Sequence, residues 1–178
     1  DSYPRASETG AVVLSAFTTK LAVYALARYF AGLDWLIWIG AVMTVFPVFF
    51  AVIENDLRKV LAYSFNNQVG FMVCAVGIGT QLAVNGAAAH AFAHIMYKAL
   101  LFMSMGAVLY RTGTTKASEL GGLHRTMPWT TLFCLVGAAS ISALPLFSGF
   151  VAKSMVMSAS HADPALFVVW IMLLFASA

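Results

Sequence analysis

The sequence has few charged residues. Of its 178 residues, only 10% are Asp, Glu, Lys or Arg, whereas 61% are hydrophobic. An average soluble domain carries about 25% charged residues, and a water-soluble chain of this size cannot hide so much apolar surface in one core. The composition therefore excludes an ordinary soluble domain and predicts a protein that is dissolved in a lipid bilayer.

Cofactor and nucleic-acid signals are also missing. The ten Lys and Arg residues against seven Asp and Glu give a net charge of only +3 and are scattered, so no nucleic-acid-binding patch is expected. The sequence contains neither a Gly-x-Gly-x-x-Gly motif nor a cysteine cluster, so we expect no flavin, haem or iron–sulfur cofactor. Cys74 and Cys134 stand alone in apolar runs, as small buried thiols do.

The two ends of the sequence lack the usual landmarks of a complete protein. It begins with Asp1, has no initiating Met and no signal-peptide pattern, and stops at Ala178 inside an apolar run. We therefore expect the chain to be a fragment of a longer protein.

Long apolar runs dominate what is present. A helix needs about 20 apolar residues to cross a bilayer, and runs without alternation do not suit a membrane β-barrel. We predict an all-α, polytopic transmembrane helix bundle with five complete spans and a truncated sixth. The apolar segments are residues 11–32, 35–54, 60–80, 86–110, 128–159 and 164–178.

Basic residues gather in alternate loops. If the helices alternate in direction, the residues before 11, the 54–59 loop and the 111–127 loop share one side of the membrane. The opposite side has only Arg28, and the excess of Lys and Arg predicts that the first side is cytoplasmic. The basic residues of that side are Arg5, Arg58, Lys59, Arg111, Lys116 and Arg125.

The fifth segment is too long for one straight span. Its 32 residues would extend about 48 Å as a helix, against a hydrocarbon core of about 30 Å. Its middle contains Leu144 and Pro145, followed by Ser148 and Gly149, which remove a backbone donor and loosen the helix. We predict two half-helices joined by a non-helical link, a device that transporters place at ion sites. A proline kink in a tilted helix is the alternative.

Three lysines lie deep inside apolar segments. Lys20, Lys98 and Lys153 would each cost roughly 2.5–3.5 kcal/mol at mid-membrane, and such residues mark ion pathways. His90, His94 and Lys98 are four residues apart, so they follow one stripe of a helix. Histidine titrates near neutrality. We predict a proton relay formed by Lys20, His94, Lys98 and Lys153, with His90 as a further candidate.

Simpler interpretations stay open for the same residues. A histidine inside a membrane helix often serves helix packing, and His90 could lie near the interface. His90 and His94 have the spacing of a zinc pair, but no third ligand is near, so no metal is expected. Lys153 could be a static strut that pairs with an acid outside this sequence. The polar run 66–68 could hold water or join helices.

Three motifs resemble one family. Residues 54–64 (Glu-Asn-Asp-Leu-Arg-Lys-Val-Leu-Ala-Tyr-Ser), continued by 67–70 (Asn-Gln-Val-Gly), are similar to a segment of the Mrp antiporter and respiratory complex I family of proton-translocating membrane subunits. Residues 90–102, with His90, His94 and Lys98, and residues 142–154 are also similar, in the same order. The opening residues 1–4 resemble the end of the family's preceding loop.

The resemblance implies a fold and roles for the buried residues. Family members have about fourteen helices in which two five-helix repeats are inverted, so residues 11–32 would be the linking helix and about 35–178 most of the second repeat of a single transmembrane domain. Lys20 matches the lysine that connects two half-channels, His94 and Lys98 match the central relay, and Lys153 matches its terminal residue. The first repeat, with its paired glutamate and lysine, is absent, so this chain alone is not expected to complete a transport path.

The run 18–26 resembles the D-type subunit of Mrp-type bacterial sodium/proton antiporters. The resemblance therefore implies cation/proton translocation in a bacterial inner (plasma) membrane. Its partners would be the lipid bilayer, other membrane subunits, and protons, with sodium as a further candidate ion. The alternative is a proton-pumping subunit of NADH:quinone oxidoreductase, whose redox chemistry would sit in other subunits, so whether the parent complex is an enzyme stays open. A structural membrane subunit and an integral-membrane enzyme are more remote alternatives.

Overall fold

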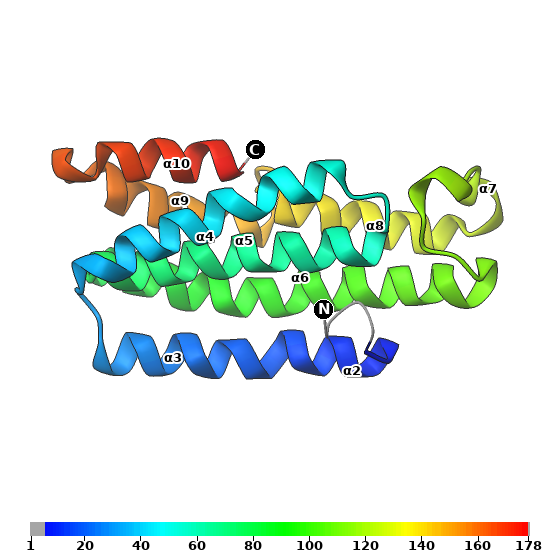
Figure 1. Ribbon diagram of the computed structural model, residues 1–178, viewed down its shortest axis with the longest axis horizontal. Coiled ribbons are helices and arrows are strands. Elements are labelled where there is room, and N and C mark those ends of the chain that lie inside the picture. Colours follow the sequence, from blue (N-terminus) through cyan, green and yellow to red (C-terminus); the bar gives the residue numbers. More distant parts are fainter. Residues whose placement is uncertain (1–5, 178) are drawn as a thin grey trace.

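The computed structural model describes residues 6–177, and every regular element in that range is a helix. Arg5 and the opening residues 1–4 lie outside this range. The elements are α2 (Glu8–Val13), the π-helical turn η1 (Leu14–Thr18), α3 (Thr19–Tyr29), α4 (Asp34–Ile53), α5 (Leu57–Ile78), α6 (Gln81–Thr112), η2 (Ala117–Glu119), α7 (Leu123–Thr126), α8 (Pro128–Ile141), α9 (Ser148–His161), η3 (Pro164–Leu166) and α10 (Phe167–Ser177). The long helices run along the long axis of the molecule (Figure 1), which confirms the predicted helix bundle.

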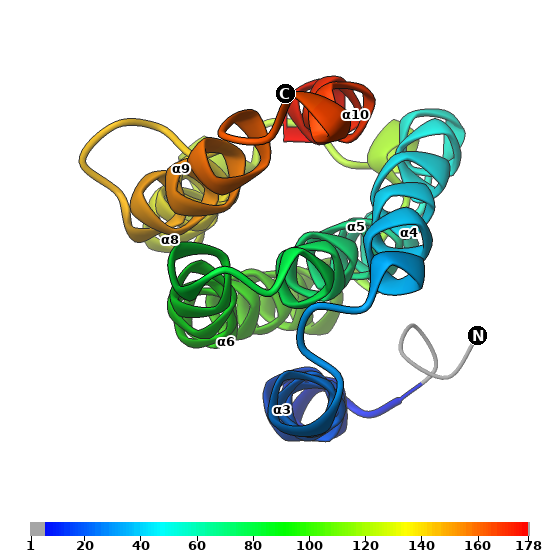
Figure 2. The same ribbon diagram turned by 90° about the vertical axis from the view of Figure 1, so that its left-hand side faces the viewer.

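Helix α5 forms the centre of the bundle. Its residues 67–77 are all buried, and it packs against α4, α6, α9 and α3. Small residues let membrane helices approach closely: a Cβ added at Gly40 of α4 would lie 2.7 Å from the Cα of Cys74, and one at Gly77 would lie 2.8 Å from Cγ1 of Ile37. Seen along the bundle, α3 stands apart from the other helices (Figure 2).

The loop before α5 and the loop after α6 meet at one end of the bundle. Asp56 and Lys116 form an isolated antiparallel bridge. The guanidinium of Arg58 donates a hydrogen bond of 2.9 Å to the carbonyl of Ala6, which brings the start of the described chain to the same end. Arg28 lies in the last turn of α3, toward the opposite end (Figure 1). The basic loops therefore share one end of the bundle.

Fewer helices than expected satisfy the simple criterion for a span. Among the described residues, three are long and apolar enough, Thr9–Tyr29, Asp34–Ile53 and Gln81–Thr112, and the bent pair α9–α10 brings the number to four. Helix α5 has 22 residues but carries the polar run 66–68, of which Asn67 and Gln68 are buried inside the bundle and Asn66 is exposed. Helices α8 and α9 have only 14 residues each because the chain breaks between them. The expected number of five complete spans stays a prediction.

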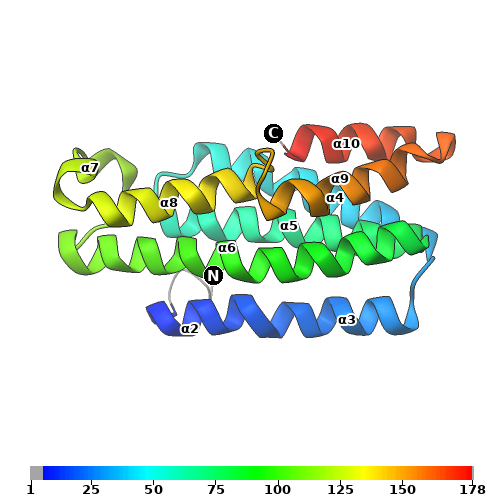
Figure 3. The ribbon, with the colours of Figure 1, turned by 180° about the vertical axis from the view of Figure 1, so that it is seen from behind.

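Helices α8 and α9 lie end to end beside α6 (Figure 3), so the fifth predicted span is a broken helix. The link holds Leu144 and Pro145, and its backbone is left-handed at Ala143 (φ 56°) and Leu146 (φ 79°). Such conformations in non-glycine residues cost about 1–3 kcal/mol each and persist only where the surroundings enforce them. A simple proline kink does not describe this geometry.

The two half-helices touch at their facing ends. Ser148 and Gly149 begin α9, and the hydroxyls of Ser140 and Ser148 are 3.2 Å apart. A Cβ added at Gly149 would collide with the carbonyl oxygen of Ser140 and lie 3.0 Å from its carbon. Glycine at this position is what allows the end of α8 to approach the start of α9.

Candidate functional site

The three residues of the predicted helical stripe share one buried face of α6. His90, His94 and Lys98 each have 0% of their surface exposed, although all three carry ionisable groups. Helix α6 is packed there by α5, α9 and α8. Lys153 on α9 is also buried at 2% exposure, whereas Lys20 on α3 is half-buried. His90, His94, Lys98 and Lys153 are therefore enclosed in the interior, whereas Lys20 lies at its edge.

Lys20 connects α3 to this face. Its Nζ donates a 2.6 Å hydrogen bond to the carbonyl of Ser15, in the π-helical turn, and lies 2.8 Å from Nδ1 of His94. The same ammonium sits 4.7 Å from the ring centroid of Phe65. π-helical turns are frequent at functional sites because they displace a carbonyl from the regular ladder. Here the turn presents an acceptor to a cation that also contacts a histidine.

Lys98 is satisfied by oxygens of α5. Its Nζ donates to the carbonyl of Leu61 at 2.8 Å and forms a short hydrogen bond with the hydroxyl of Ser64. Its distance to the ring centroid of Phe102 is 5.9 Å. A buried cation needs hydrogen-bond acceptors to offset its loss of hydration. The two oxygens of α5 supply acceptors for a charged Lys98.

Lys153 reaches back across the broken helix. Its Nζ donates a 2.8 Å hydrogen bond to the carbonyl of Ile141, the last residue of α8. The last carbonyls of a helix lack intrahelical partners, so the break itself creates the acceptor for this cation. The ammonium also lies 5.3 Å from the ring centroid of Phe71 on α5.

The two histidines have unused polar atoms. Neither ring nitrogen of His90 has a hydrogen-bond partner among the described residues, and the same holds for Nε2 of His94. The His90 and His94 rings are 6.3 Å apart, and the His90 ring stacks on Phe71 at 6.0 Å and 12°. Buried polar atoms in native proteins are almost always paired, often by water. Three ring nitrogens of this face are therefore left without the partner that buried polar atoms normally have.

A second polar line starts at Tyr97. Its hydroxyl donates to Oε1 of Gln68 at 3.3 Å, Gln68 donates to Oδ1 of Asn67 at 2.9 Å, and Asn67 donates to the carbonyl of Ala176 at 3.1 Å. The ring of Tyr97 meets that of His94 edge-on at 5.3 Å. The sequence marked 66–68 as polar but gave no sign of Tyr97, whose partner depends on how α5 packs against α6.

A cavity of about 320 Å³ adjoins the broken helix. Lys153 and Ser64, the serine that bonds Lys98, both lie in its wall. The hydroxyl and amide groups of the wall and the size of the cavity give it room for several waters. The lining residues are Val48, Ala51, Val52, Val60, Ser64, Asn67, Gln68, Ile141, Ser142, Lys153, Ala176 and Ser177.

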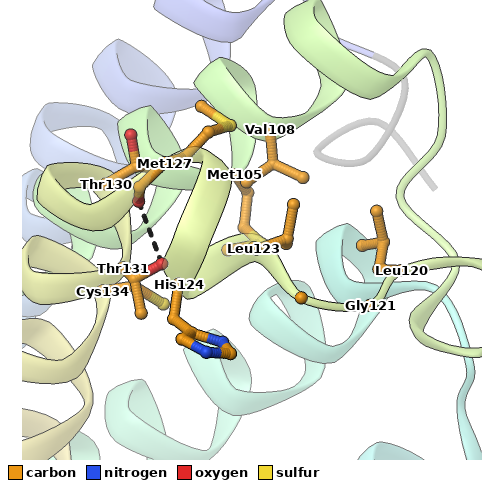
Figure 4. A pocket seen from close by; sticks show the side chains of 11 residues that line it. Met105, Val108, Leu120, Gly121, Leu123, His124, Met127, Thr130, Thr131 and Cys134 are labelled. Atoms are coloured by element: carbon orange, nitrogen blue, oxygen red, sulfur yellow. Dashed lines mark hydrogen bonds between the residues drawn. The ribbon is translucent and has the colours of Figure 1, made fainter.

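Of the other hollows in the described structure, two contain basic or thiol side chains. A groove of about 870 Å³ between α3 and α6 includes Lys20 and Arg28, so Lys20 is reachable from beyond the bundle. A pocket of about 320 Å³ at the loop end is lined by His124 and Cys134 and by Thr131, which bonds the Met127 carbonyl at 3.0 Å (Figure 4). This second pocket contacts none of the buried lysines.

Ion pairs do not neutralise the buried cations. Within residues 6–177 the salt bridges are Lys59–Glu54 and Lys116–Glu119, both in the loops at one end. In the second of these loops, hydrogen bonds from Thr114 and Lys116 keep the pKa of the exposed Glu119 below its usual value. A static strut at Lys153 would require an acid from outside the described chain.

Comparison with known proteins places this arrangement in a family. The sequence model of the NADH:quinone oxidoreductase/Mrp antiporter transmembrane region matches residues 1–178. The chain belongs to this family. It is 38% identical over 152 residues to the D-type subunit of the Na(+)/H(+) antiporter of Alkalihalophilus pseudofirmus, covering 80% of this chain and 31% of that protein.

Other relatives come from several branches. Hydrogenase-4 component B of Escherichia coli is 28% identical over 176 residues, which is 85% of this chain and 26% of the relative. NADH-ubiquinone oxidoreductase chain 5 of Dugong dugon is 31% identical over 122 residues, which is 68% of this chain and 20% of the relative. This chain thus spans a third or less of the length of these curated relatives.

Two solved complexes contain a chain of the same fold. The archaeal membrane-bound sulfane sulfur reductase matches with a TM-score of 0.91 and 30% identity, over 98% of this chain and 38% of the matched chain. The Mrp complex from Dietzia sp. DQ12-45-1b matches with a TM-score of 0.84 and 29% identity, over 98% and 35% respectively. Both are membrane complexes, and the chain is accordingly part of a multi-pass membrane protein.

Proposed function

We propose that the protein to which this chain belongs translocates protons, coupled to a cation, across a membrane through Lys20, His94, Lys98 and Lys153, with His90 as an added member. The contact between Lys20 and His94 carries the proposal. It joins ionisable groups of two helices in an apolar interior, where neither group has a structural need to be charged. Each proton that crosses uses about 2.3 kcal/mol per 100 mV of membrane potential.

The order of transfer follows from the contacts. A proton on Lys20 passes to Nδ1 of His94, which holds its other nitrogen free to release it. Lys98 is the next basic group on the same face of α6, and its partner Ser64 lines the cavity at the broken helix. Water in this cavity would carry the proton to Lys153. Changing the charge of one relay residue alters the proton affinity of its neighbours. A change of charge outside this chain can therefore drive proton transfer along the relay.

The D-type subunit of an Mrp sodium/proton antiporter is the branch we favour. The similarity to that protein in Alkalihalophilus pseudofirmus, at 38% identity, supports it. An antiporter-like, proton-pumping subunit of NADH:quinone oxidoreductase is the second candidate, supported by 31% identity to chain 5 of that complex in Dugong dugon. In either case other membrane subunits are the expected partners, and protons are the shared substrate.

The setting of the chain is part of the proposal. Residues 11–32 would be the helix that links two repeats, in keeping with the separate position of α3, and residues 35–178 would form most of the second repeat. The excess of Lys and Arg in the 54–59 and 111–127 loops supports a cytoplasmic location for them, in a bacterial inner membrane.

Ion exchange in everted membrane vesicles that carry the full-length parent complex tests this function. Lys98→Ala should abolish sodium- or potassium-driven proton exchange, while Lys59→Ala, which changes an exposed lysine in the first turn of α5, should leave it unchanged. Native gel analysis of the same membranes should show the complex assembled in both variants. Failed assembly of Lys98→Ala, with normal exchange in whatever complex remains, would instead identify a structural role.

A further inference from the structure

Phe71 lies between His90 and Lys153. Its side chain is fully buried on α5. One face of the ring stacks on His90, at 6.0 Å and 12°, and the ammonium of Lys153 lies 5.3 Å from the same ring centroid. The ring of Phe71 on α5 therefore contacts both His90 on α6 and the ammonium of Lys153 on α9.

No hydrogen bond bridges His90 and Lys153 among the described residues. Both nitrogens of His90 are buried without a partner, although an ionisable ring in such a place normally finds one. Lys153 directs its ammonium to the carbonyl of Ile141 and to the Phe71 ring. Protons move along hydrogen bonds, and a phenyl ring offers none.

We propose that Phe71 gates a branch of the relay, the direct route from His90 to Lys153, a role that rests on the proposed function. The route from Lys98 through the cavity does not pass this ring. In the arrangement seen here the ring closes the direct route from His90 to Lys153. When the ring turns aside, a water molecule enters between them. The imidazolium N–H of His90 gives its proton to this water, and the water gives one to the neutral amine of Lys153, so that one proton moves and no electrons are exchanged.

The charge of Lys153 sets the state of the gate. A charged ammonium is attracted to the face of an aromatic ring, whereas a neutral amine is not. Phe71 is therefore held in the closed position while Lys153 carries a proton and is released once that proton has left. The ring turns aside only when Lys153 is neutral and can accept a proton, so the branch stays closed while Lys153 is charged.

Passive proton leak distinguishes a gate from a packing residue. In everted vesicles with the full-length complex, an imposed pH gradient is allowed to collapse without a driving cation. Phe71→Ala should speed the collapse severalfold. Adding Lys153→Ala to it should return the leak to the wild-type rate, because the leak must pass through Lys153. Met72→Ala is the matched control, since Met72 is the next residue and equally buried but has no aromatic ring.

The proton leak of the Phe71 variants tests the gate. A wild-type leak in assembled Phe71→Ala, or a faster leak that Lys153→Ala does not suppress, would overturn the gate. If the alanine variant does not accumulate, Phe71→Leu replaces it: this side chain fills most of the volume without a flat ring, and it should leak more than Met72→Ala. A leucine variant as tight as wild type would also overturn the gate. Unchanged exchange in Lys98→Ala and Lys153→Ala would reject the relay itself, which is a separate result.

Discussion

Nζ of Lys20 and Nδ1 of His94 lie 2.8 Å apart, although 74 positions separate the two residues in the sequence. This contact is where α3, which also packs against α5, meets the ionisable face of α6. A lysine that only reinforced helix packing would be expected beside an acid or a set of carbonyls. A histidine neighbour can exchange a proton with it.

The Lys20–His94 pair should behave as one unit in transport. Lys20→Ala and His94→Ala are each expected to lower exchange by about tenfold or more, and the double variant should be no slower than the worse single variant, because residues in contact do not add. Initial rates in vesicles with equal amounts of complex give the comparison. Losses that multiply would mean that the two residues act independently.

Ser64 should affect the rate of ion exchange through its hydrogen bond with Lys98. A hydrogen bond to a charged group contributes about 1.5–3 kcal/mol, so Ser64→Ala is expected to slow exchange by roughly tenfold, since about 1.4 kcal/mol corresponds to that factor. Ser154→Ala serves as the control, because the Ser154 hydroxyl donates to the nearby Val151 carbonyl and bonds no buried lysine within residues 6–177. Equal rates in the two serine variants would remove Ser64 from the relay.

Gly149 is expected to be required for stability at the broken helix. An alanine methyl group there would strike the carbonyl of Ser140, and overpacking of this kind costs about 1–3 kcal/mol. Gly149→Ala should therefore lower the melting temperature of the purified protein. Gly121→Ala should not, because an added Cβ at Gly121 meets nothing within 4 Å. A similar melting temperature for both variants would show that the break tolerates extra volume.

Asp56 caps α5 and joins two loops. Its carboxylate accepts hydrogen bonds of 2.9 Å from the amide of Arg58 and from the hydroxyl of Thr115. Asp56→Ala is expected to cost about 1 kcal/mol from the cap alone and to loosen the loop after α6. Faster amide hydrogen exchange at Arg58, whose amide bonds Asp56, and at Leu57, whose amide bonds the Thr115 carbonyl, would report this loosening. Asp56→Asn keeps an acceptor and should exchange like wild type; if it loosens equally, the negative charge rather than the cap holds the loops.

Much of the fold could be predicted from the sequence, because a bilayer strongly limits the length and composition of the helices that cross it. Apolar runs revealed the helices to within a few residues; the fourth, expected over 86–110, extends over Gln81–Thr112. Pro145 and Gly149 revealed the broken helix. Sequence could not show that α5 would be the most enclosed helix, since its run 66–68 looks too polar for that position. The buried Asn67 and Gln68 of this run are accommodated by partners on α10 and α6, whereas Asn66 is exposed.

Only part of the candidate site could be predicted from the sequence. The spacing of His90, His94 and Lys98 follows from helix geometry, so their common buried face could be predicted. Their partners could not, because the Lys20–His94 contact and the Lys153–Ile141 hydrogen bond depend on how separate helices pack. Phe71 is one of 14 phenylalanines, and nothing in the sequence distinguishes it from the others.

The most direct test of the relay is proton exchange in everted vesicles with Lys153→Ala in the full-length parent, compared with wild type at equal assembly. The relay predicts that exchange is lost while the complex stays intact, because Lys153 is the buried cation at the broken helix and has no acidic partner in the described chain. Unchanged exchange would contradict the relay and make Lys153 a structural residue.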